Sequence, residues 1–91
     1  MSDNDNDPPV NVQNMQDLPR GTRFIGPDGA RYKVTAPASE HEHGFVFVWN
    51  LSMGDGEVLR RLSTPGWCKE GTHPREMFFA YSHPTEVEVL P

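Results

Sequence analysis

The chain has 91 residues, a hydrophobic fraction of 35% and a formal net charge of −5 at pH 7. This length is enough for one domain and too short for two, so any hydrophobic core is small. The acidic balance argues against a general binder of duplex DNA or of RNA, because such proteins normally carry a clear surplus of Lys and Arg.

The cysteine content and the first residues indicate a cytoplasmic protein. The single cysteine, Cys68, excludes an intrachain disulfide, as is usual in a reducing compartment. The opening residues MSDNDNDPPV have neither the basic start nor the apolar stretch of a secretory signal. No apolar run approaches the roughly 20 residues that are needed to cross a bilayer. We therefore expect a cytoplasmic protein without a membrane partner.

Residues 1–17 differ in composition from the rest of the chain. They hold four Asp, no Lys or Arg, and only Val10, Val12 and Met15 as apolar side chains. Such a segment buries too little apolar surface to offset the entropy lost on ordering. The sequence therefore predicts a disordered acidic leader over residues 1–17 and a folded domain over residues 18–91. The alternative is an acidic arm that mimics DNA or binds a partner.

A first hairpin is predicted where residues 22–25 and 31–35 flank the turn Gly26-Pro27-Asp28-Gly29. Turns of this composition between β-branched and aromatic runs specify antiparallel pairing. In the second of these strands Tyr32 and Val34 alternate with basic residues, which indicates one buried and one solvent-exposed face.

A second hairpin is predicted from residues 45–51 (FVFVWNL) and 57–62 (EVLRRL), with residues 52–56 as its turn. The run FVFVWNL is apolar on both faces. Such a strand is either central and covered on both sides, or it exposes an apolar patch.

The remaining segments predict a long loop and two more strands. Residues 63–76 lack periodicity and contain two Gly and two Pro, and a connection of this length is often functional. Residues 77–81 form a fifth strand and residues 82–85 a short turn or one 3₁₀ turn. Residues 86–90 form a last strand, with Val87 and Val89 inward and Glu86 and Glu88 outward. No segment indicates an α-helix.

Five or six short antiparallel strands need protected edges, and closing the sheet into a small barrel provides them. The order of these elements over residues 18–91 resembles SH3-like small barrels, in which one 3₁₀ turn precedes the last strand. The chain is also similar to short proteins of bacterial and phage genomes. The resemblance implies an all-β fold, a small antiparallel barrel of five to six strands, behind the leader.

Two groups of residues are candidates for metal binding and for catalysis. His41 and His43 could chelate a metal if a third ligand converged on them, namely Cys68, His73 or His83. The spacings match no zinc pattern, so we expect no metal and no cofactor. Cys68 beside Lys69, with His73 five residues on, could form a nucleophile and base, but no orienting residue accompanies them. The sequence therefore predicts a protein that is not an enzyme.

The long loop suggests a binding function instead. Trp67 lies between Gly66 and Cys68, and an aromatic residue on such a loop is either a contact anchor or a lid over an open barrel end. We expect a non-enzymatic module that binds another protein, as a monomer or an edge-paired homodimer. In a phage or mobile element it would inhibit a host protein. The expected contact residues are Phe45, Trp49, Arg60, Arg61, Trp67, Lys69, Arg75 and Tyr81.

The alternative function is a barrel that binds single-stranded nucleic acid. Arg60, Arg61, Lys69 and Arg75 lie close together along the chain, and aromatic side chains accompany them. A basic surface with aromatic side chains can hold the phosphates and stack the bases of a single strand.

Overall fold

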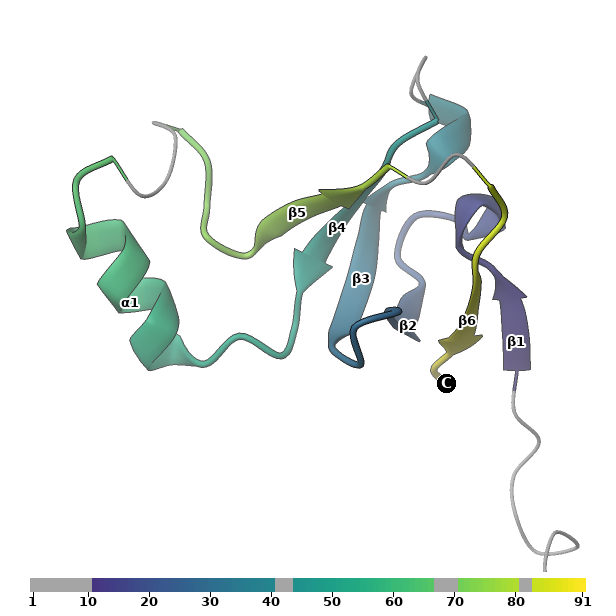
Figure 1. The fold of residues 1–91 in the computed structure, drawn as a ribbon, viewed down its shortest axis with the longest axis horizontal. Helices are drawn as coiled ribbons and strands as arrows, with labels where there is room; N and C mark the ends of the chain where they lie inside the picture. Colours follow the sequence, from purple (N-terminus) through teal and green to yellow (C-terminus); the bar gives the residue numbers. More distant parts are fainter. Residues whose placement is uncertain (1–10, 41–43, 67–70, 81–82) are drawn as a thin grey trace, which may run out of the picture.

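The computed structural model describes residues 11–40, 44–66, 71–80 and 83–91. Six strands form one antiparallel sheet in the order β1-β6-β2-β3-β4-β5, and one short helix, α1, stands apart from it (Figure 1). The strands are β1 (Asn11–Asn14), β2 (Arg23–Ile25), β3 (Arg31–Ala36), β4 (Val46–Asn50), β5 (Glu76–Phe79) and β6 (Glu86–Val89). The helices are α1 (Asp55–Ser63) and two single 3₁₀ turns, η2 (Met15–Asp17) and η3 (Ala38–Glu40). The predicted all-β class is confirmed.

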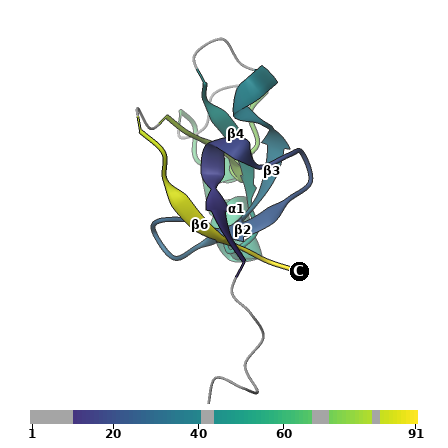
Figure 2. The same cartoon turned by 90° about the vertical axis from the view of Figure 1, so that its right-hand side faces the viewer.

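The predicted closure of the barrel is wrong. Within the described residues β1 and β5 are the two edges of the sheet, and they do not pair with each other. The sheet nevertheless bends over a single core, because Val87 of β6 and Val46 of β4 lie in the same buried cluster. Figure 2 shows this curvature along the long axis of the molecule. The strands have only three to six residues, and such short strands enclose the core from several sides without meeting at the edges.

Residues 11–17 are part of the folded domain, which corrects the predicted boundary at residue 18. Strand β1 pairs with β6 over its whole length, and η2 follows it directly. The backbone N–H of Met15 donates to the Thr85 carbonyl at 2.8 Å, and the Met15 side chain is 0% exposed. The partners of this segment lie about seventy residues further along the chain, so its own composition could not reveal them. Residues 1–10 of the predicted leader lie outside the described residues.

The first hairpin is confirmed. Strands β2 and β3 pair with Phe24 opposite Tyr32, and the Gly26 N–H donates to the Ala30 carbonyl at 2.8 Å. Gly29 has a φ of +86°, the left-handed conformation that closes the turn and that a residue with a Cβ rarely adopts. Tyr32 and Val34 of β3 are buried, as the alternation predicted.

The second predicted hairpin is wrong, because Asp55–Ser63 forms the helix α1 and not a fourth strand. Several local signals favour this helix. Acidic residues occupy its first turn and arginines its last, which complements the helix dipole. Glu57 forms ion pairs three and four residues on, with Arg60 and Arg61. Alternation in EVLRRL is weak, and its residues other than Val58 are good helix formers, so the helical interpretation was available from the sequence.

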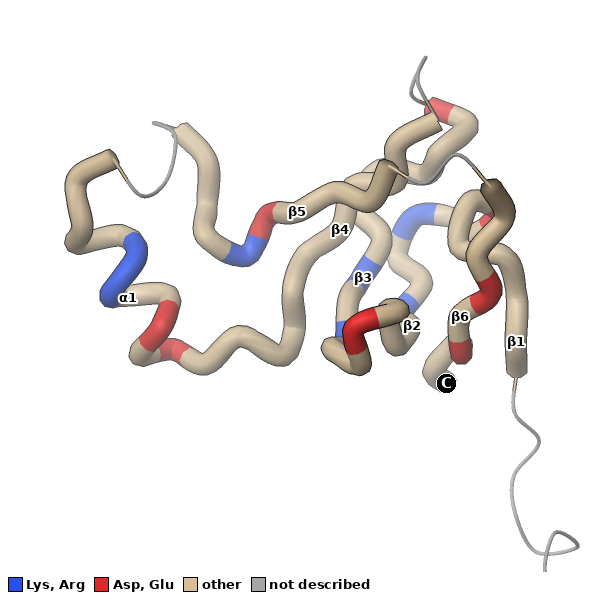
Figure 3. The backbone as a smooth tube through the Cα atoms, in the orientation of Figure 1, with Lys and Arg blue, Asp and Glu red and all other residues tan. Residues whose placement is uncertain are grey.

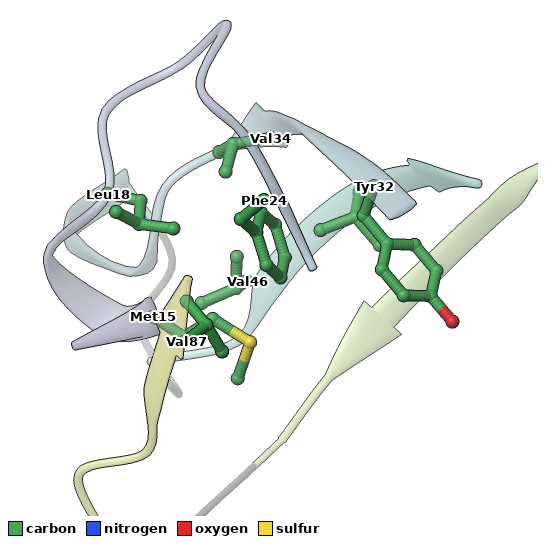
Figure 4. Packing of buried hydrophobic residues seen from close by; sticks show 8 residues of the cluster. Met15, Leu18, Phe24, Tyr32, Val34, Val46 and Val87 are labelled. Carbon is green, nitrogen blue, oxygen red and sulfur yellow. The ribbon is translucent and has the colours of Figure 1, made fainter. Parts of the chain in front are cut away.

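The core fills the concave side of the sheet and is capped by η2. Its eight buried members are Met15, Leu18, Phe24, Tyr32, Val34, Val46, Val48 and Val87 (Figure 4). Phe24 and Tyr32 lie 5.8 Å apart between ring centroids, and Phe79 of β5 packs edge-on against Tyr32 at 5.1 Å. Most of the core therefore comes from alternate positions of strands that the sequence predicted correctly.

Two further expectations concern the last strand and the turn before it. Strand β6 buries Val87 and exposes Glu86 and Glu88, as predicted. The described residues of the preceding segment, 83–85, form a bend, which fits the short turn among the two predicted alternatives. In the part of the chain that the structure describes, no helix has the length and apolar character to cross a membrane.

Candidate aromatic interaction surface

Strand β4 has two apolar faces, and the structure shows that only one of them is covered by the core. Val46 and Val48 point into the core and are buried. Phe45, Phe47 and Trp49 alternate with these valines, so they lie on the opposite, convex face, and they are half-buried. Of the two interpretations of FVFVWNL, the exposed apolar patch is therefore correct.

Pairing with β5 extends this patch to the edge of the sheet. Phe47 lies directly opposite Phe78, which is 54% exposed. The Phe78 ring stacks on Phe45, with centroids 5.3 Å apart and planes at 21°, and lies 5.7 Å from the Phe47 ring. We call Phe45, Phe47 and Phe78 the aromatic patch. Exposed apolar surface of this kind on a small protein marks an interaction site more often than an isolated exposed residue does.

A shallow groove adjoins the aromatic patch along β5. It is lined by Phe47, Thr72, Glu76, Met77 and Phe78. Two members of the patch, Phe47 and Phe78, therefore line this groove. An extended ligand along β5 would contact both the groove and the rings.

The backbone of β5 also offers hydrogen-bonding groups to a ligand. The Asn50 N–H donates to the Arg75 carbonyl at 2.8 Å. This bond shows which of the residue pairs between β4 and β5 are hydrogen-bonded to each other. Because hydrogen-bonded and non-hydrogen-bonded pairs alternate in antiparallel sheets, Met77 and Phe79 bond to β4, and the N–H and C=O of Phe78 point away from it. No strand in the described residues pairs with this second side of β5.

Trp49, a predicted contact residue, lies at the flank of the aromatic patch. Its ring stacks on the His73 ring, with centroids 4.6 Å apart and planes at 28°. His73 Nδ1 in turn accepts the backbone N–H of Arg75 at 3.1 Å. These contacts hold the Trp49 ring in place and leave it half-buried beside Glu76, its cross-strand neighbour.

Arg75, another predicted contact residue, stabilises the connection between β4 and α1. Its Nη1 donates to the carbonyls of Asn50 and Met53 at 3.1 and 2.6 Å, and its Nη2 lies 3.0 Å from Asp55 Oδ1. The side chain is only 17% exposed. These bonds position the first turn of α1 relative to the sheet, so the structure gives Arg75 a structural role.

Arg75→Gln is therefore expected to lower the free energy of unfolding by about 1 kcal/mol, because the bonds to charged and carbonyl acceptors are lost together. Urea denaturation followed by tryptophan fluorescence measures this. Arg31→Gln is the matched control, since Arg31 is exposed and has no carboxylate partner among the described residues. Equal stability of the two variants would contradict the structural role of Arg75.

Arg60 and Arg61 lie on α1 and share one carboxylate. Glu57 lies 2.7 Å from Arg60 Nη2 and 3.2 Å from Arg61 Nε. The hydrogen bond from Arg60, and then that from Arg61, hold the pKa of Glu57 below its usual value. Both arginines are thus paired with a carboxylate, and they lie on a helix that stands apart from the sheet (Figures 1 and 3). The other predicted contact residues, Trp67, Lys69 and Tyr81, lie outside the described residues.

A different set of cations lies beside Trp49. By register, Arg23 of β2, Lys33 of β3 and Trp49 follow one another across the convex face of the sheet. Neither cation has a carboxylate partner in the described part of the chain. Figure 3 shows these basic positions on β2 and β3, with acidic positions on the adjacent β6. The alternation of RYKVT placed Lys33 outward, but only the strand order brings it next to Trp49.

The described residues contain no group of three or more His, Cys, Asp or Glu side chains able to hold a metal ion. His73 is engaged with Trp49 and with the backbone of Arg75. Among the other residues named for metal binding or catalysis, His83 lies in the turn before β6, where its carbonyl accepts from Gln16 Nε2 at 3.0 Å, and His41, His43, Cys68 and Lys69 lie outside the described residues.

Comparison of the chain with protein-family models, with curated proteins and with solved structures found no match. The proposal for its function therefore depends on the aromatic patch and on the β5 edge.

Proposed function

We propose that the protein is a non-enzymatic interaction module that binds another protein through the aromatic patch and the open edge of β5. The observation that carries this proposal is the exposure of Phe78 at the open edge of the sheet. The residue is 54% exposed and its ring belongs to a cluster of three aromatic rings, and its backbone N–H and C=O point away from β4 at the open edge. One residue thus presents both an apolar anchor and a pair of hydrogen-bonding groups.

These two features suit an extended segment of a partner that adds to the sheet as a further strand. In strand addition, main-chain hydrogen bonds supply affinity and alternate side chains supply specificity. Alternate residues of the added strand would face the aromatic patch on the convex side of the sheet. We propose that the module acts in the cytoplasm. If a phage or mobile element encodes it, the module would inhibit a host protein by covering the segment of that protein that adds to β5.

A random peptide library displayed on phage tests this function without knowledge of the natural partner. Peptides are selected on the wild-type protein and then measured against Phe78→Lys by fluorescence anisotropy. We expect selected peptides to carry apolar residues at alternate positions and to lose at least about tenfold in affinity for the variant, because aromatic anchors dominate binding energy.

The matched control is Val12→Lys, which places the same charge on the opposite edge of the sheet, where Val12 is 49% exposed. This variant should bind the selected peptides as the wild type does. Failure to enrich any peptide, or equal losses in the two variants, would refute the proposed function.

Binding of single-stranded nucleic acid is the second candidate function, and Arg23 and Lys33 favour it. They lie beside Trp49 on the convex face without carboxylate partners among the described residues, whereas Arg60, Arg61 and Arg75 are ion-paired. Anisotropy with a labelled oligothymidine separates the two functions. Binding that weakens steeply between about 50 and 200 mM salt, and that Lys33→Gln reduces, would favour nucleic acid over a protein partner.

A further inference from the structure

We infer that the β5 edge also pairs with β5 of a second copy of the chain, about a two-fold axis that lies midway between the two Phe78 residues. Only one consequence of this pairing rests on the proposed function, namely that a β5 edge paired with a second copy is closed to other partners. The pairing itself follows from the backbone phase, the side-chain register and the charge of residues 76–80.

Residues of β5 alternate between bonding to β4 and pointing away from it, and this alternation leaves the Phe78 backbone groups available beside the axis. The N–H and C=O of Phe78 point away from β4, so two antiparallel copies of β5 can exchange both bonds at Phe78. The same phase directs the Ala80 N–H towards the Glu76 carbonyl of the second copy. The Glu76 N–H is already bonded to the His73 carbonyl at 2.9 Å and is not needed.

The side chains are self-complementary in this register. Phe78 lies opposite Phe78 of the second copy, Met77 opposite Phe79, and Glu76 opposite Ala80. Glu76 is the one charged residue of this segment, and it faces a small neutral residue. Like charges directly opposite each other destabilise a strand pair, and the axis at Phe78 avoids them.

Both faces of the joined sheet would gain apolar contacts. An axis perpendicular to the sheet keeps each face on its own side, so the aromatic patches of the two copies become neighbours. On the concave face, Met77 and Phe79 are partly buried and already pack against the core. The two cores would thus become continuous across the junction.

The β5 edge of the sheet lacks the usual protection against pairing, and the β1 edge is mostly polar. Edge strands are commonly protected by Lys, Pro or a covering element. Residues 76–80 contain neither Lys nor Pro, and α1 lies beyond the start of β5 along the long axis and not beside its open edge (Figure 1). The other edge, β1, carries mostly polar side chains, Asn11, Gln13 and Asn14.

A charge-swap experiment tests the position of the axis. Phe78→Glu and Phe78→Lys each place two like charges opposite each other, so each variant alone should sediment as a monomer where the wild type is a dimer. An equimolar mixture of the two variants should form a heterodimer, because the axis brings the Glu and the Lys together. Sedimentation velocity over a micromolar to millimolar series measures all three samples, with circular dichroism to confirm folding.

The outcomes are distinguishable from those of the peptide experiment. A wild type that stays monomeric to millimolar concentration, or a dimer that both Phe78 variants leave intact, overturns self-pairing, even if selected peptides still bind. A mixture that remains monomeric overturns the axis at Phe78. A dimer that obeys the charge swap while no peptide is enriched supports self-pairing and rejects the proposed function. If self-pairing and peptide binding are both observed, selected peptides should dissociate the dimer, because they compete for the same β5 edge.

Discussion

Met15→Ala is expected to lower the free energy of unfolding by about 2–5 kcal/mol, the range found when large apolar side chains are truncated in a core. The Met15 side chain is fully buried and packs with Leu18 in the main cluster. A small domain has a total stability of only about 5–15 kcal/mol, so this loss would remove a large fraction of it. Equilibrium denaturation in urea, followed by far-ultraviolet circular dichroism, measures the change.

The control for Met15→Ala is Val12→Ala. Val12 lies three residues earlier in the same segment, on the exposed side of β1, and should change stability by less than about 0.5 kcal/mol. If the two variants were equally stable, residues 11–17 would not belong to the core, and the predicted disordered leader would be correct after all.

Gly26→Ala is expected to destabilise the domain by about 1–3 kcal/mol through overpacking. A Cβ at this position would lie 2.6 Å from Tyr32 Cε2 and 3.0 Å from Tyr32 Cδ2. The Tyr32 ring cannot move away easily, because it is buried against Phe24 and Phe79 and its hydroxyl donates to Asp28. Thermal unfolding followed by differential scanning calorimetry measures the effect.

Gly56→Ala is the matched control for this substitution. A Cβ at Gly56 meets nothing within 4 Å, and the residue lies inside α1. Alanine should therefore stabilise the domain by up to about 1 kcal/mol through helix propensity and through the entropy of the unfolded chain. Opposite signs for the two substitutions would confirm the close contact of Gly26 with Tyr32. A neutral Gly26→Ala would contradict it.

The helix α1 lies where a hairpin was predicted, although the sequence also holds local signals for a helix. The turn-like segment with two glycines that precedes residues 57–62 favours a hairpin. The spacing of Glu57 to Arg60 and Arg61 is nonetheless that of helical ion pairs. Leu59 and Leu62 are 63% and 55% exposed, so burial on the sheet contributes little to this helix. Its local interactions, together with the anchoring by Arg75, favour the helical state.

The candidate site was predictable only in part. Phe45 and Trp49 were expected from the aromatic run, and both lie on the convex face. Phe78, the central residue of the patch, was not singled out, because MFFAY does not show which of its two phenylalanines faces outward. The pairing of Phe47 with Phe78 and of Val46 with Phe79 decides this, and that register depends on β4.

By itself the sequence determined the β2–β3 hairpin, the positions of β4, β5 and β6, and the inward residues Tyr32, Val34 and Val87. Turn chemistry and alternation act between near neighbours, so they can be recognised without the rest of the chain. Only the tertiary structure decided that Met15 completes the core, that the sheet stays open, and that Phe78 lies at an unpaired edge. These features depend on strand order and on contacts between residues distant in sequence, which no local pattern encodes.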